Sequence, residues 1–460
     1  METKAASLHT LPPEPRQKHW FWGHIPYLIK DVLHYLQSTQ QEVGKIAWLR
    51  SKIAKICIIS DPEYIKHVLQ DNNKNYVKGN VFRFLKPLVG NGLLTSEGDF
   101  WRRQRRLAQP AFHKERLAAM SQAMVTCTEQ MVAEWQQRYQ DGDTIDMTLE
   151  MNKIALTIVS NALFKSDVKS DFEIVNQNLG FLVERITYRF RHPLKQIPLW
   201  IPTPTNLKER AAIRALEKVI HQIIAKKRAE GTRKENGDLL DMLMEAVDEE
   251  TGERMSDKQL RDEVLTIFLA GHETSANTLA YMWWLLSLNP EAADKISKEL
   301  TTVLQGKTPT FEDLKQLPYC RQVINETLRL YPPAYAIERK SVAADQIGGY
   351  HIPKDTNVII SSYVLHRMPE LWGHDADLFK PERFETELVK KQPRFAYFPF
   401  GGGPRLCIGD QFALFEITIV LAMVWQHFRF EPLVPQPQLS LEPLVTLRTK
   451  ENIRLKIRRI

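Results

Sequence analysis

The stretch from residue 400 to 409 constrains the fold more than any other part of the chain. It reads Phe-Gly-Gly-Gly-Pro-Arg-Leu-Cys-Ile-Gly, and an apolar segment with helical spacing follows it, from Asp410 to about His427. Glycines allow a backbone to pass close to something flat or bulky. Cys407 would lie at or just before a helix N-terminus, where the helix dipole and free N–H groups favour a thiolate. A thiolate beside Arg405 is a suitable ligand for a soft or redox metal.

Other interpretations of this glycine-rich loop are weaker. A phosphate-binding loop requires Lys-Ser/Thr after its last glycine, and Arg405-Leu406 does not supply it. A dinucleotide-binding loop requires a third glycine at position 406, which is Leu406. A lone cysteine can also be a small buried residue with no chemical role. A cysteine ligand to haem iron is one of the few known arrangements that fit the loop.

A long helical pattern runs from Ser256 to Leu288 and ends at Asn289-Pro290. Ser256 and Gln259 form a capping-box signature at its start. In its middle lies Ala-Gly-His-Glu-Thr-Ser, residues 270–275, and a glycine inside a helix costs about 1 kcal/mol relative to alanine. We expect Thr274 to bond back to the carbonyl of residue 270. A zinc hydrolase is excluded because the second histidine of His-Glu-x-x-His would be residue 276, which is Ala276.

Two further motifs are ambiguous by themselves. Trp101 and Arg105 are four residues apart within a basic run, so they share one face of a predicted helix, which could equally be a solvated basic surface. Glu326 and Arg329 have the spacing of an ordinary helical ion pair, and Arg383 follows much later in the chain.

Together and in this order, the motifs resemble the cytochrome P450 family. The cysteine loop of that family matches Phe400, Gly403, Arg405, Cys407 and Gly409. The signature of its long helix matches Ala270, Gly271, Glu273, Thr274 and Ser275. The resemblance runs from about Trp101 to Glu416 by motif, and from the apolar runs at residues 46–49 and 56–59 onward by pattern.

The resemblance implies the site residues. It implies that Cys407 is the axial ligand of the iron of haem b (iron-protoporphyrin IX), and that Glu273 and Thr274 relay protons to oxygen at the haem. It implies propionate contacts from Trp101, Arg105 and Arg339, besides Arg405. It also places Ala270 and Gly271 against the haem, and makes Glu326, Arg329 and Arg383 a buried structural charge triad.

The implied activity is that of a haem-thiolate monooxygenase, which hydroxylates a substrate with O2. A hydrophobic small molecule such as a fatty acid, terpenoid or steroid-like compound is expected, because the candidate pocket residues are apolar: Phe82, Phe84, Leu85, Ile267, Phe268, Ala336 and Ile337. Two alternatives stay open. One is a haem-thiolate isomerase or peroxygenase, and the other is a non-catalytic haem carrier or gas sensor.

The fold expected is mainly α with a small β-rich minority, in which the long helix crosses one domain over a buried haem. That single haem domain spans residues 1–460, of which residues 1–40 form an N-terminal extension with an aromatic patch. Residues 46–49 and 56–59 should pair as a hairpin, and residues 453–458 alternate as a half-buried strand does.

The net charge and the cysteine content limit the cellular compartment and the binding partners of the protein. Four widely spaced cysteines favour a reducing compartment over a disulfide framework. We expect a cytoplasmic, soluble bacterial-type monomer that binds no nucleic acid. The aromatic patch has two interpretations: it covers the core, which is the favoured one, or it makes peripheral membrane contact. The net charge is +7, and Arg102, Arg103, Arg106, Lys391 and Arg394 could form a basic face for an acidic electron donor. That donor would be a separate ferredoxin, flavodoxin or reductase.

Overall fold

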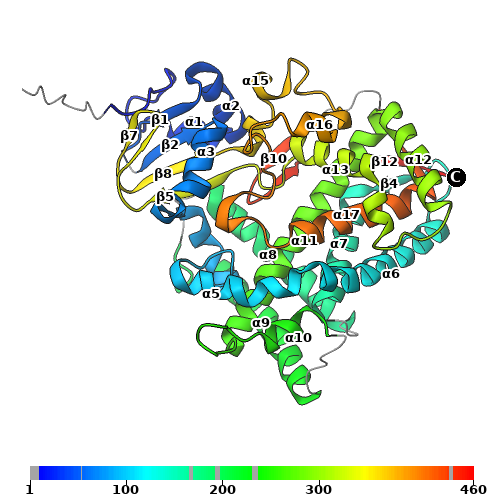
Figure 1. Ribbon diagram of the computed structural model, residues 1–460. Coiled ribbons are helices and arrows are strands. Elements are labelled where there is room, and N and C mark those ends of the chain that lie inside the picture. The colour runs from blue at the N-terminus through cyan, green and yellow to red at the C-terminus, as the bar shows by residue number, and fades with distance from the viewer. Residues whose placement is uncertain (1–9, 53, 165–168, 192–196, 231–236, 435–438) are drawn as a thin grey trace, which may run out of the picture. The chain divides into compact units, whose positions relative to one another are not determined.

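The computed structural model describes residues 10–52, 54–164, 169–191, 197–230, 237–434 and 439–460. Its contacts divide the chain into two compact units. Unit 1 comprises residues 1–81, 334–378 and 387–407, and unit 2 comprises residues 82–333, 379–386 and 408–460. Each unit is described by itself (Figure 1). The assignment of residues 1–460 to one haem domain stays a prediction.

A five-stranded sheet organises unit 1, in the order β1-β2-β8-β5-β3. The predicted hairpin is confirmed, because Ile46 pairs with Ile59 and Leu49 with Ile56 in antiparallel register. Strand β2 also pairs in parallel with the distant β8, whereas β8–β5 and β5–β3 are antiparallel. The strands are β1 (Ile46–Leu49), β2 (Lys55–Ile59), β3 (Tyr76–Lys78), β5 (Ile337–Ser341) and β8 (Thr356–Ile360), with the separate pair β6 (Asp345–Ile347) and β7 (Tyr350–Ile352).

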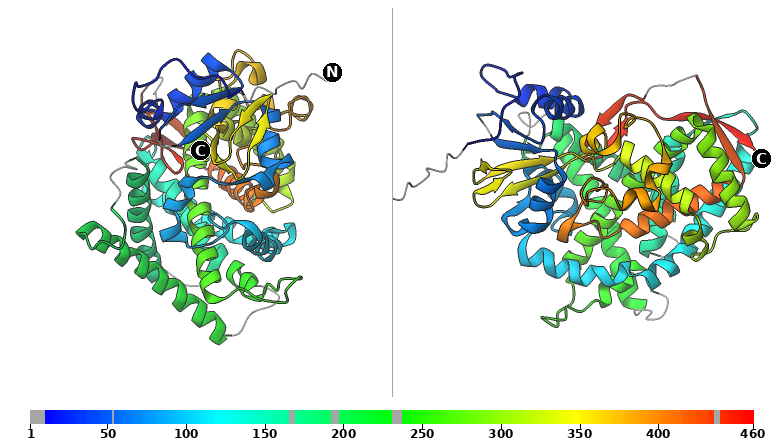
Figure 2. Two further views of the ribbon diagram at one scale, coloured as in Figure 1. Left: turned by 90° about the vertical axis from the view of Figure 1, so that its left-hand side faces the viewer. Right: turned by 45° about the horizontal axis from the view of Figure 1, so that its top comes forward.

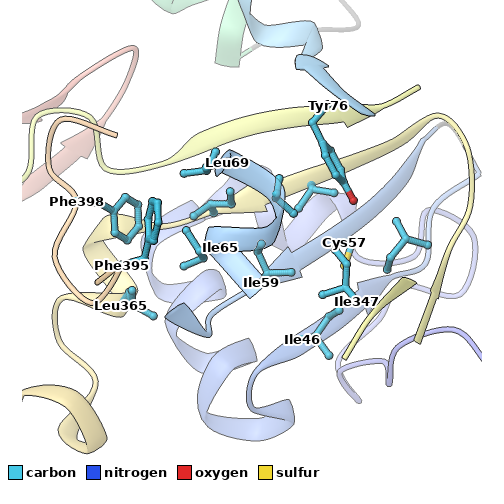
Figure 3. Close-up of a cluster of buried hydrophobic side chains, with 14 of the residues drawn as sticks. Ile46, Cys57, Ile59, Ile65, Leu69, Tyr76, Ile347, Leu365, Phe395 and Phe398 are labelled. Carbon is cyan, nitrogen blue, oxygen red and sulfur yellow. The ribbon is translucent and has the colours of Figure 1, made fainter. Parts of the chain in front are cut away.

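Short helices pack on this sheet and enclose its core. Helix α3 begins after Asp61, whose side chain accepts from the backbone N–H groups of Glu63 and Tyr64, as the Asp-Pro signal predicts. Figure 3 shows Ile65 and Leu69 pointing toward Phe395 and Phe398 in one buried cluster. The helices are α1 (Ile25–Lys30), α2 (Val32–Val43), α3 (Pro62–Lys66), α14 (Ser362–Leu365) and α15 (Pro369–Trp372). The π-helical turn η1 (His67–Asp71) directly follows α3.

Unit 2 is built around α11 (Asp257–Leu288), which packs against α7, α13 and α17 (Figure 1). Both predicted ends of α11 are confirmed: Ser256 and Gln259 form a reciprocal capping box, and Asn289 is the C-cap. The other long helices are α5 (Gly98–Ala108), α6 (Lys114–Arg138), α7 (Met147–Phe164), α8 (Lys169–Arg191), α9 (Pro204–Glu230), α12 (Pro290–Leu304), α13 (Pro318–Leu330) and α17 (Asp410–Trp425).

The remaining elements of unit 2 include a sheet of order β4-β12-β9 and the antiparallel pair β10–β11, which Figure 2 shows from two further directions. The inner residues of strand β12 alternate between buried and half-buried side chains, as the sequence predicts. The strands are β4 (Thr144–Asp146), β9 (Phe428–Pro432), β10 (Leu441–Pro443), β11 (Leu447–Thr449) and β12 (Arg454–Arg459). Besides the short helices already named, the structure contains α4 (Lys86–Val89), α10 (Leu239–Glu245) and α16 (Thr386–Val389), and the single turns η2 (Asn73–Asn75), η3 (Asn80–Phe84), η4 (Gln109–Phe112), η6 (Asp313–Gln316), η7 (Pro381–Phe384) and η8 (Gly403–Arg405). The protein is thus mainly helical with a strand-rich minority, as predicted.

Candidate functional site

The cysteine loop in unit 1 is held in a conformation that only glycine allows at two positions. Gly401 and Gly403 have φ angles of +74° and +66°, which side chains disfavour. A Cβ added at Gly403 would lie 1.9 Å from the carbonyl oxygen of Leu69, and one at Gly402 would lie 2.3 Å from the ring of Phe395. The loop is therefore packed directly against η1 and the aromatic core of unit 1.

Cys407 differs from the other three cysteines in exposure. Cys57, Cys127 and Cys320 are buried, whereas Cys407 is exposed at the end of the loop. Its backbone N–H donates to the carbonyl of Phe400 at 3.0 Å, which closes the loop, and the helix α17 begins three residues later at Asp410. Burial raises the pKa of the Cys57 and Cys320 thiols above their ordinary value, so those thiols are protonated and inert. Cys407 is the accessible thiol of the four.

Arg339 and Ile337 come to unit 1 from β5. The Arg339 side chain is buried and donates to the carbonyl of Glu338 at 3.1 Å. The side chain of Ile337 approaches within 3.6 Å of the Cβ position of Gly401, so β5 lies beside the cysteine loop. Ala336, just before β5, is half-buried. Arg405 lies in η8 within the loop and is also half-buried.

Thr274 and Ala270 lie on one face of α11 in unit 2. The Thr274 hydroxyl donates to the Ala270 carbonyl at 2.7 Å, the back-bond that the sequence predicts. Ala270 is exposed although buried residues flank it on this long helix, and Thr274 is half-buried. A small exposed side chain one turn from a hydroxyl leaves room for a flat group beside the helix.

Gly271 lies where α7 approaches α11 closely. A Cβ at this position would lie 3.1 Å from Val159 Cγ2 on α7, so a larger side chain would require Val159 to move. The contact of Gly271 with a haem stays a prediction.

Glu273 is not freely mobile, because residues of the C-terminal β10–β11 pair hold its carboxylate. The Thr446 hydroxyl and the Arg448 Nε both donate to Glu273 Oε1. Asn277, one turn further along α11, donates to the Thr446 hydroxyl and the Leu447 carbonyl, each at 3.3 Å. Sequence reasoning missed Thr446 and Arg448, which carry no local signal of this contact.

Trp101 and Arg105 lie one turn apart on α5, and both are half-buried. The neighbouring basic residues are engaged elsewhere. Arg103 and Arg106 pair with Asp248, and Arg106 also pairs with Glu250 at 2.5 Å. The predicted basic face is thus balanced by carboxylates at these two positions, as is Arg102 by Asp99 at 2.7 Å.

Glu326, Arg329 and Arg383 come together in unit 2. Arg329 Nε lies 2.7 Å from Glu326 Oε2, and Arg383 Nε lies 3.6 Å from Glu326 Oε1. The Lys380 backbone N–H also donates to Glu326 at 2.8 Å, which fixes residues 379–386 against α13. Burial raises the pKa of Glu326, while both arginines and the backbone donor favour its charged form.

The pocket candidates of unit 2 lie on two segments that acidic side chains of α11 bring together. Asp262 Oδ2 accepts from the Asn91 backbone N–H at 2.8 Å, and Glu263 Oε2 accepts from that of Leu93 at 3.0 Å. These bonds tie the segment after Phe82, Phe84 and Leu85 to the helix that carries Ile267 and Phe268. Leu85 and Phe268 are buried, whereas Phe82, Phe84 and Ile267 are half-buried. Their contact with a substrate stays a prediction.

Gly409 is the least constrained of the predicted loop glycines. Within the part of the chain that the structure describes, the nearest atom to a Cβ at Gly409 would be Phe112 Cε1, at 3.9 Å. Its backbone carbonyl accepts from Ala413 N–H at 2.9 Å and so starts α17.

These features fit a haem held by a thiolate. The loop presents the exposed Cys407 in a backbone conformation that a side chain at Gly403 would not allow. Helix α11 presents the small, exposed Ala270 one turn from the Thr274 hydroxyl. Indole and guanidinium donors lie on one face of α5, and such groups bind carboxylates of the propionate type.

Comparison with known proteins agrees with this chemistry. The family model described as Cytochrome P450 matches residues 12–457. The chain is 34% identical over 445 residues to "Cyclooctatin synthase" of Streptomyces melanosporofaciens, covering 93% of this chain and 95% of that protein. It is 34% identical to "Cyclooctat-9-en-7-ol 5-monooxygenase" of the same organism, over 89% and 87% of the two chains. It is 31% identical to the chloroplastic "Carotene epsilon-monooxygenase" of Arabidopsis thaliana, over 92% and 81%.

Proposed function

Because the chain belongs to the cytochrome P450 family and is a haem-thiolate monooxygenase, we propose that Cys407 is the axial ligand of its iron. The exposure of this one thiol among four carries the proposal. The haem supplies the activation of O2 and the insertion of one oxygen atom into a substrate C–H bond. The tasks that follow fall to the side chains of this chain.

Trp101, Arg105, Arg339 and Arg405 bind the two propionates. An indole N–H donates one hydrogen bond, and guanidinium groups stay charged at every physiological pH, so both kinds of donor suit a carboxylate. The half-buried positions of Trp101 and Arg105 on a shared face of α5 support their pairing on one propionate.

Thr274 and Glu273 move protons toward oxygen. The Thr274 hydroxyl, while it donates to the Ala270 carbonyl, presents its lone pairs as an acceptor, and rotation of the hydroxyl would then allow it to donate. Glu273 is the nearest acid in sequence, and it must exchange its partners Thr446 and Arg448 before it can hand on a proton. The glutamate is therefore a controlled proton donor.

The substrate is a hydrophobic small molecule, and we propose the terpenoid class. The names of the two bacterial relatives refer to cyclooctatin and cyclooctat-9-en-7-ol, and the name of the plant relative refers to carotene. The apolar candidates on the 82–85 segment, on α11 and on β5 suit such hydrocarbon-rich compounds. A separate redox protein would provide the electrons.

Peripheral membrane contact is the proposed role of the aromatic patch at Trp20, Phe21 and Trp22. Trp20 is 88% exposed, and Lys52 Nζ lies 3.9 Å above the Phe21 ring. Aromatic side chains beside an ammonium suit an anionic bilayer surface. No helix among the described residues is long and apolar enough to span a bilayer. Trp20→Ala should weaken co-sedimentation with anionic vesicles, and unchanged binding would contradict this contact.

The test of the cofactor proposal is the difference spectrum of the dithionite-reduced protein with carbon monoxide. A strongly red-shifted Soret band is expected in the unaltered protein and in Cys127→Ala, and it should be absent in Cys407→Ala. Persistence of the band in Cys407→Ala would overturn the assignment. Spectral titrations with terpenoids, fatty acids and steroids would then test the substrate class, which tighter binding of a non-terpenoid class would refute.

A further inference from the structure

The Ser275 hydroxyl bonds differently from the other serine and threonine hydroxyls of α11. Thr266, Thr274 and Thr278 each donate to the carbonyl four residues earlier, at 2.7, 2.7 and 2.8 Å. Ser287 donates to the carbonyl three residues earlier. Ser275, next to Thr274, instead donates to Glu416 Oε2 on α17 at 2.6 Å. The Ser275 hydroxyl therefore links α11 to α17 and does not bond to a backbone carbonyl of its own helix.

Glu416 is a solitary acid in an apolar helix. From Gln411 to Trp425 it is the one charged residue of α17, and it is 1% exposed. Its Oε1 has no hydrogen-bond partner within the part of the chain that the structure describes. A carboxylate with a single hydrogen bond is costly to bury. Burial accordingly raises the pKa of Glu416 to about 8, against the smaller opposing effect of the Ser275 bond.

The surroundings of Glu416 favour its neutral form. Among the described residues, Cys127 on α6 is a titratable group that interacts with Glu416, and burial raises the pKa of the Cys127 thiol to about 11. The Cys127 thiol is neutral at pH 7 and accepts a contact from Asn161 at 3.4 Å. Among the described residues, no cation pairs with Glu416 to offset a buried negative charge. The neutral acid, joined to Ser275, is thus the form that fits this position.

The turn that contains Thr274 is consequently held from two directions. On one side Glu273 and Asn277 bond to Thr446 and Leu447 at β11. On another side Ser275 bonds to α17. Thr274 lies between these anchors, so its orientation depends on both.

We propose that Glu416 is a positioning residue that, through Ser275, holds the turn of α11 that carries Thr274. The proposal rests on the proton-relay role assigned to Thr274. Loss of the Ser275 bond frees the hydroxyl to bond back within α11, and the turn then loses its attachment to α17. Deprotonation of Glu416 weakens the attachment of α11 to α17, because a buried carboxylate without a cation is destabilised by the loss of its hydration.

Four variants of the haem-loaded protein test the proposal: Ser275→Ala, Glu416→Leu, Glu416→Gln and Thr274→Ala, with Ser287→Ala as the control on the same helix. Peroxide released per NADPH consumed is measured at pH 7 and pH 9 with surrogate redox proteins and the best-binding compound of the spectral screen. Deuterium uptake of the peptide spanning residues 266–279 gives a second measurement that does not depend on turnover.

Ser275→Ala and Glu416→Leu should release severalfold more peroxide at both pH values, with faster deuterium uptake. The unaltered protein should release more peroxide at pH 9 than at pH 7, whereas Glu416→Gln, which keeps a neutral acceptor, should not show this increase. Suppose that Thr274→Ala is uncoupled but Ser275→Ala releases no more peroxide than the control Ser287→Ala. That result would overturn the role of Glu416 and leave the proton-relay role of Thr274 intact. Normal coupling in Thr274→Ala would instead remove the proton-relay role, and with it the inference. If Glu416→Leu does not fold, the result for Ser275→Ala decides whether Glu416 positions the turn of α11.

Discussion

Arg448 Nε donates to Glu273 Oε1 across 175 positions of sequence, and the Thr446 hydroxyl donates to the same oxygen. Glu273 is buried, whereas the Arg448 side chain is 32% exposed. The partly exposed Arg448 guanidinium therefore reaches from the surface to the buried Glu273 carboxylate, next to Thr274. This contact fixes the direction of the Glu273 carboxylate before any proton moves.

Replacing Arg448 should leave that acid without its cation. Arg448→Met should lower the free energy of unfolding by about 1–3 kcal/mol, because a buried carboxylate loses a charged donor. Urea denaturation measures the change. Arg454→Met is the matched control, since Arg454 lies 3.6 Å from Asp146 and is 62% exposed, and its loss should cost less than about 1 kcal/mol. If Glu273→Gln does not recover part of the stability lost in Arg448→Met, the pairing is not the cause.

The buried group formed by Glu326, Arg329 and Arg383 should be far more sensitive. Both Glu326 and Arg329 have side chains that are 0% exposed. Arg329→Met should destabilise the protein by about 3–5 kcal/mol, because Glu326 would keep only the more distant Arg383 and the Lys380 N–H. Lys295→Met, which breaks the exposed pair with Glu382, should cost less than about 1 kcal/mol. Equal effects of the two substitutions in guanidinium denaturation would contradict this distinction.

The two glycines of the cysteine loop should differ sharply in their tolerance of a methyl group. Gly403→Ala requires a positive φ and places Cβ 1.9 Å from the Leu69 carbonyl oxygen, so the loop must move. We expect loss of the red-shifted Soret band and a lower melting temperature. Gly409→Ala adds a methyl group 3.9 Å from Phe112, at a negative φ of −98°, and the apoprotein should keep its melting temperature. A Gly403→Ala protein with the unaltered spectrum would refute the packing argument.

The sequence predicted what depends on local signals. The capping box at Ser256 and the stop at Asn289 fixed α11 at both ends, because caps satisfy the free backbone groups of a helix. The hairpin at residues 46–59 followed from two short apolar runs around Ser51-Lys52. In these cases the determinants lie within a few residues of each other.

The remaining features depend on partners that are distant in the chain. The parallel pairing of β2 with β8 joins residues about 300 positions apart, and local periodicity does not specify a partner. The same holds for Arg448 with Glu273, and for Val159, which lies against Gly271. Glu416 was visible as a lone acid in an apolar run, but nothing in the sequence named Ser275 as its partner.

The electron donor should depend on the exposed cations of unit 1 more than on those of α5. Lys391 and Arg394 are exposed, whereas Arg106 is engaged with Asp248 and Glu250. Lys391→Glu/Arg394→Glu should slow reduction by an acidic ferredoxin severalfold and weaken its salt dependence. Arg106→Glu should mainly lower the melting temperature. Stopped-flow reduction at two ionic strengths separates the cases, and identical rates in the double variant would exclude this docking surface.

His272 should make the protein sensitive to mild acid. Burial lowers the pKa of its ring to about 4, while Glu273 opposes and Arg448 adds to the effect. Its Nε2 is buried and has no hydrogen-bond partner among the described residues. Between pH 6.5 and 4 the unfolded chain binds a proton at this ring that the folded chain does not, so stability falls as pH falls through that range. The loss of stability from this ring is about 3.4 kcal/mol at most, and the loss is complete below pH 4.

His272→Gln should therefore reduce the loss of unfolding free energy between pH 6.5 and 4, measured by urea denaturation at half-unit steps. His374→Gln is the matched control, because His374 is exposed and its replacement should leave the pH dependence unchanged. Above pH 6.5 the ring is neutral in both states, so the difference between His272→Gln and the unaltered protein should be constant there. A pH dependence in His272→Gln parallel to that of the unaltered protein from pH 6.5 to 4 would show that this ring takes up its proton equally in both states.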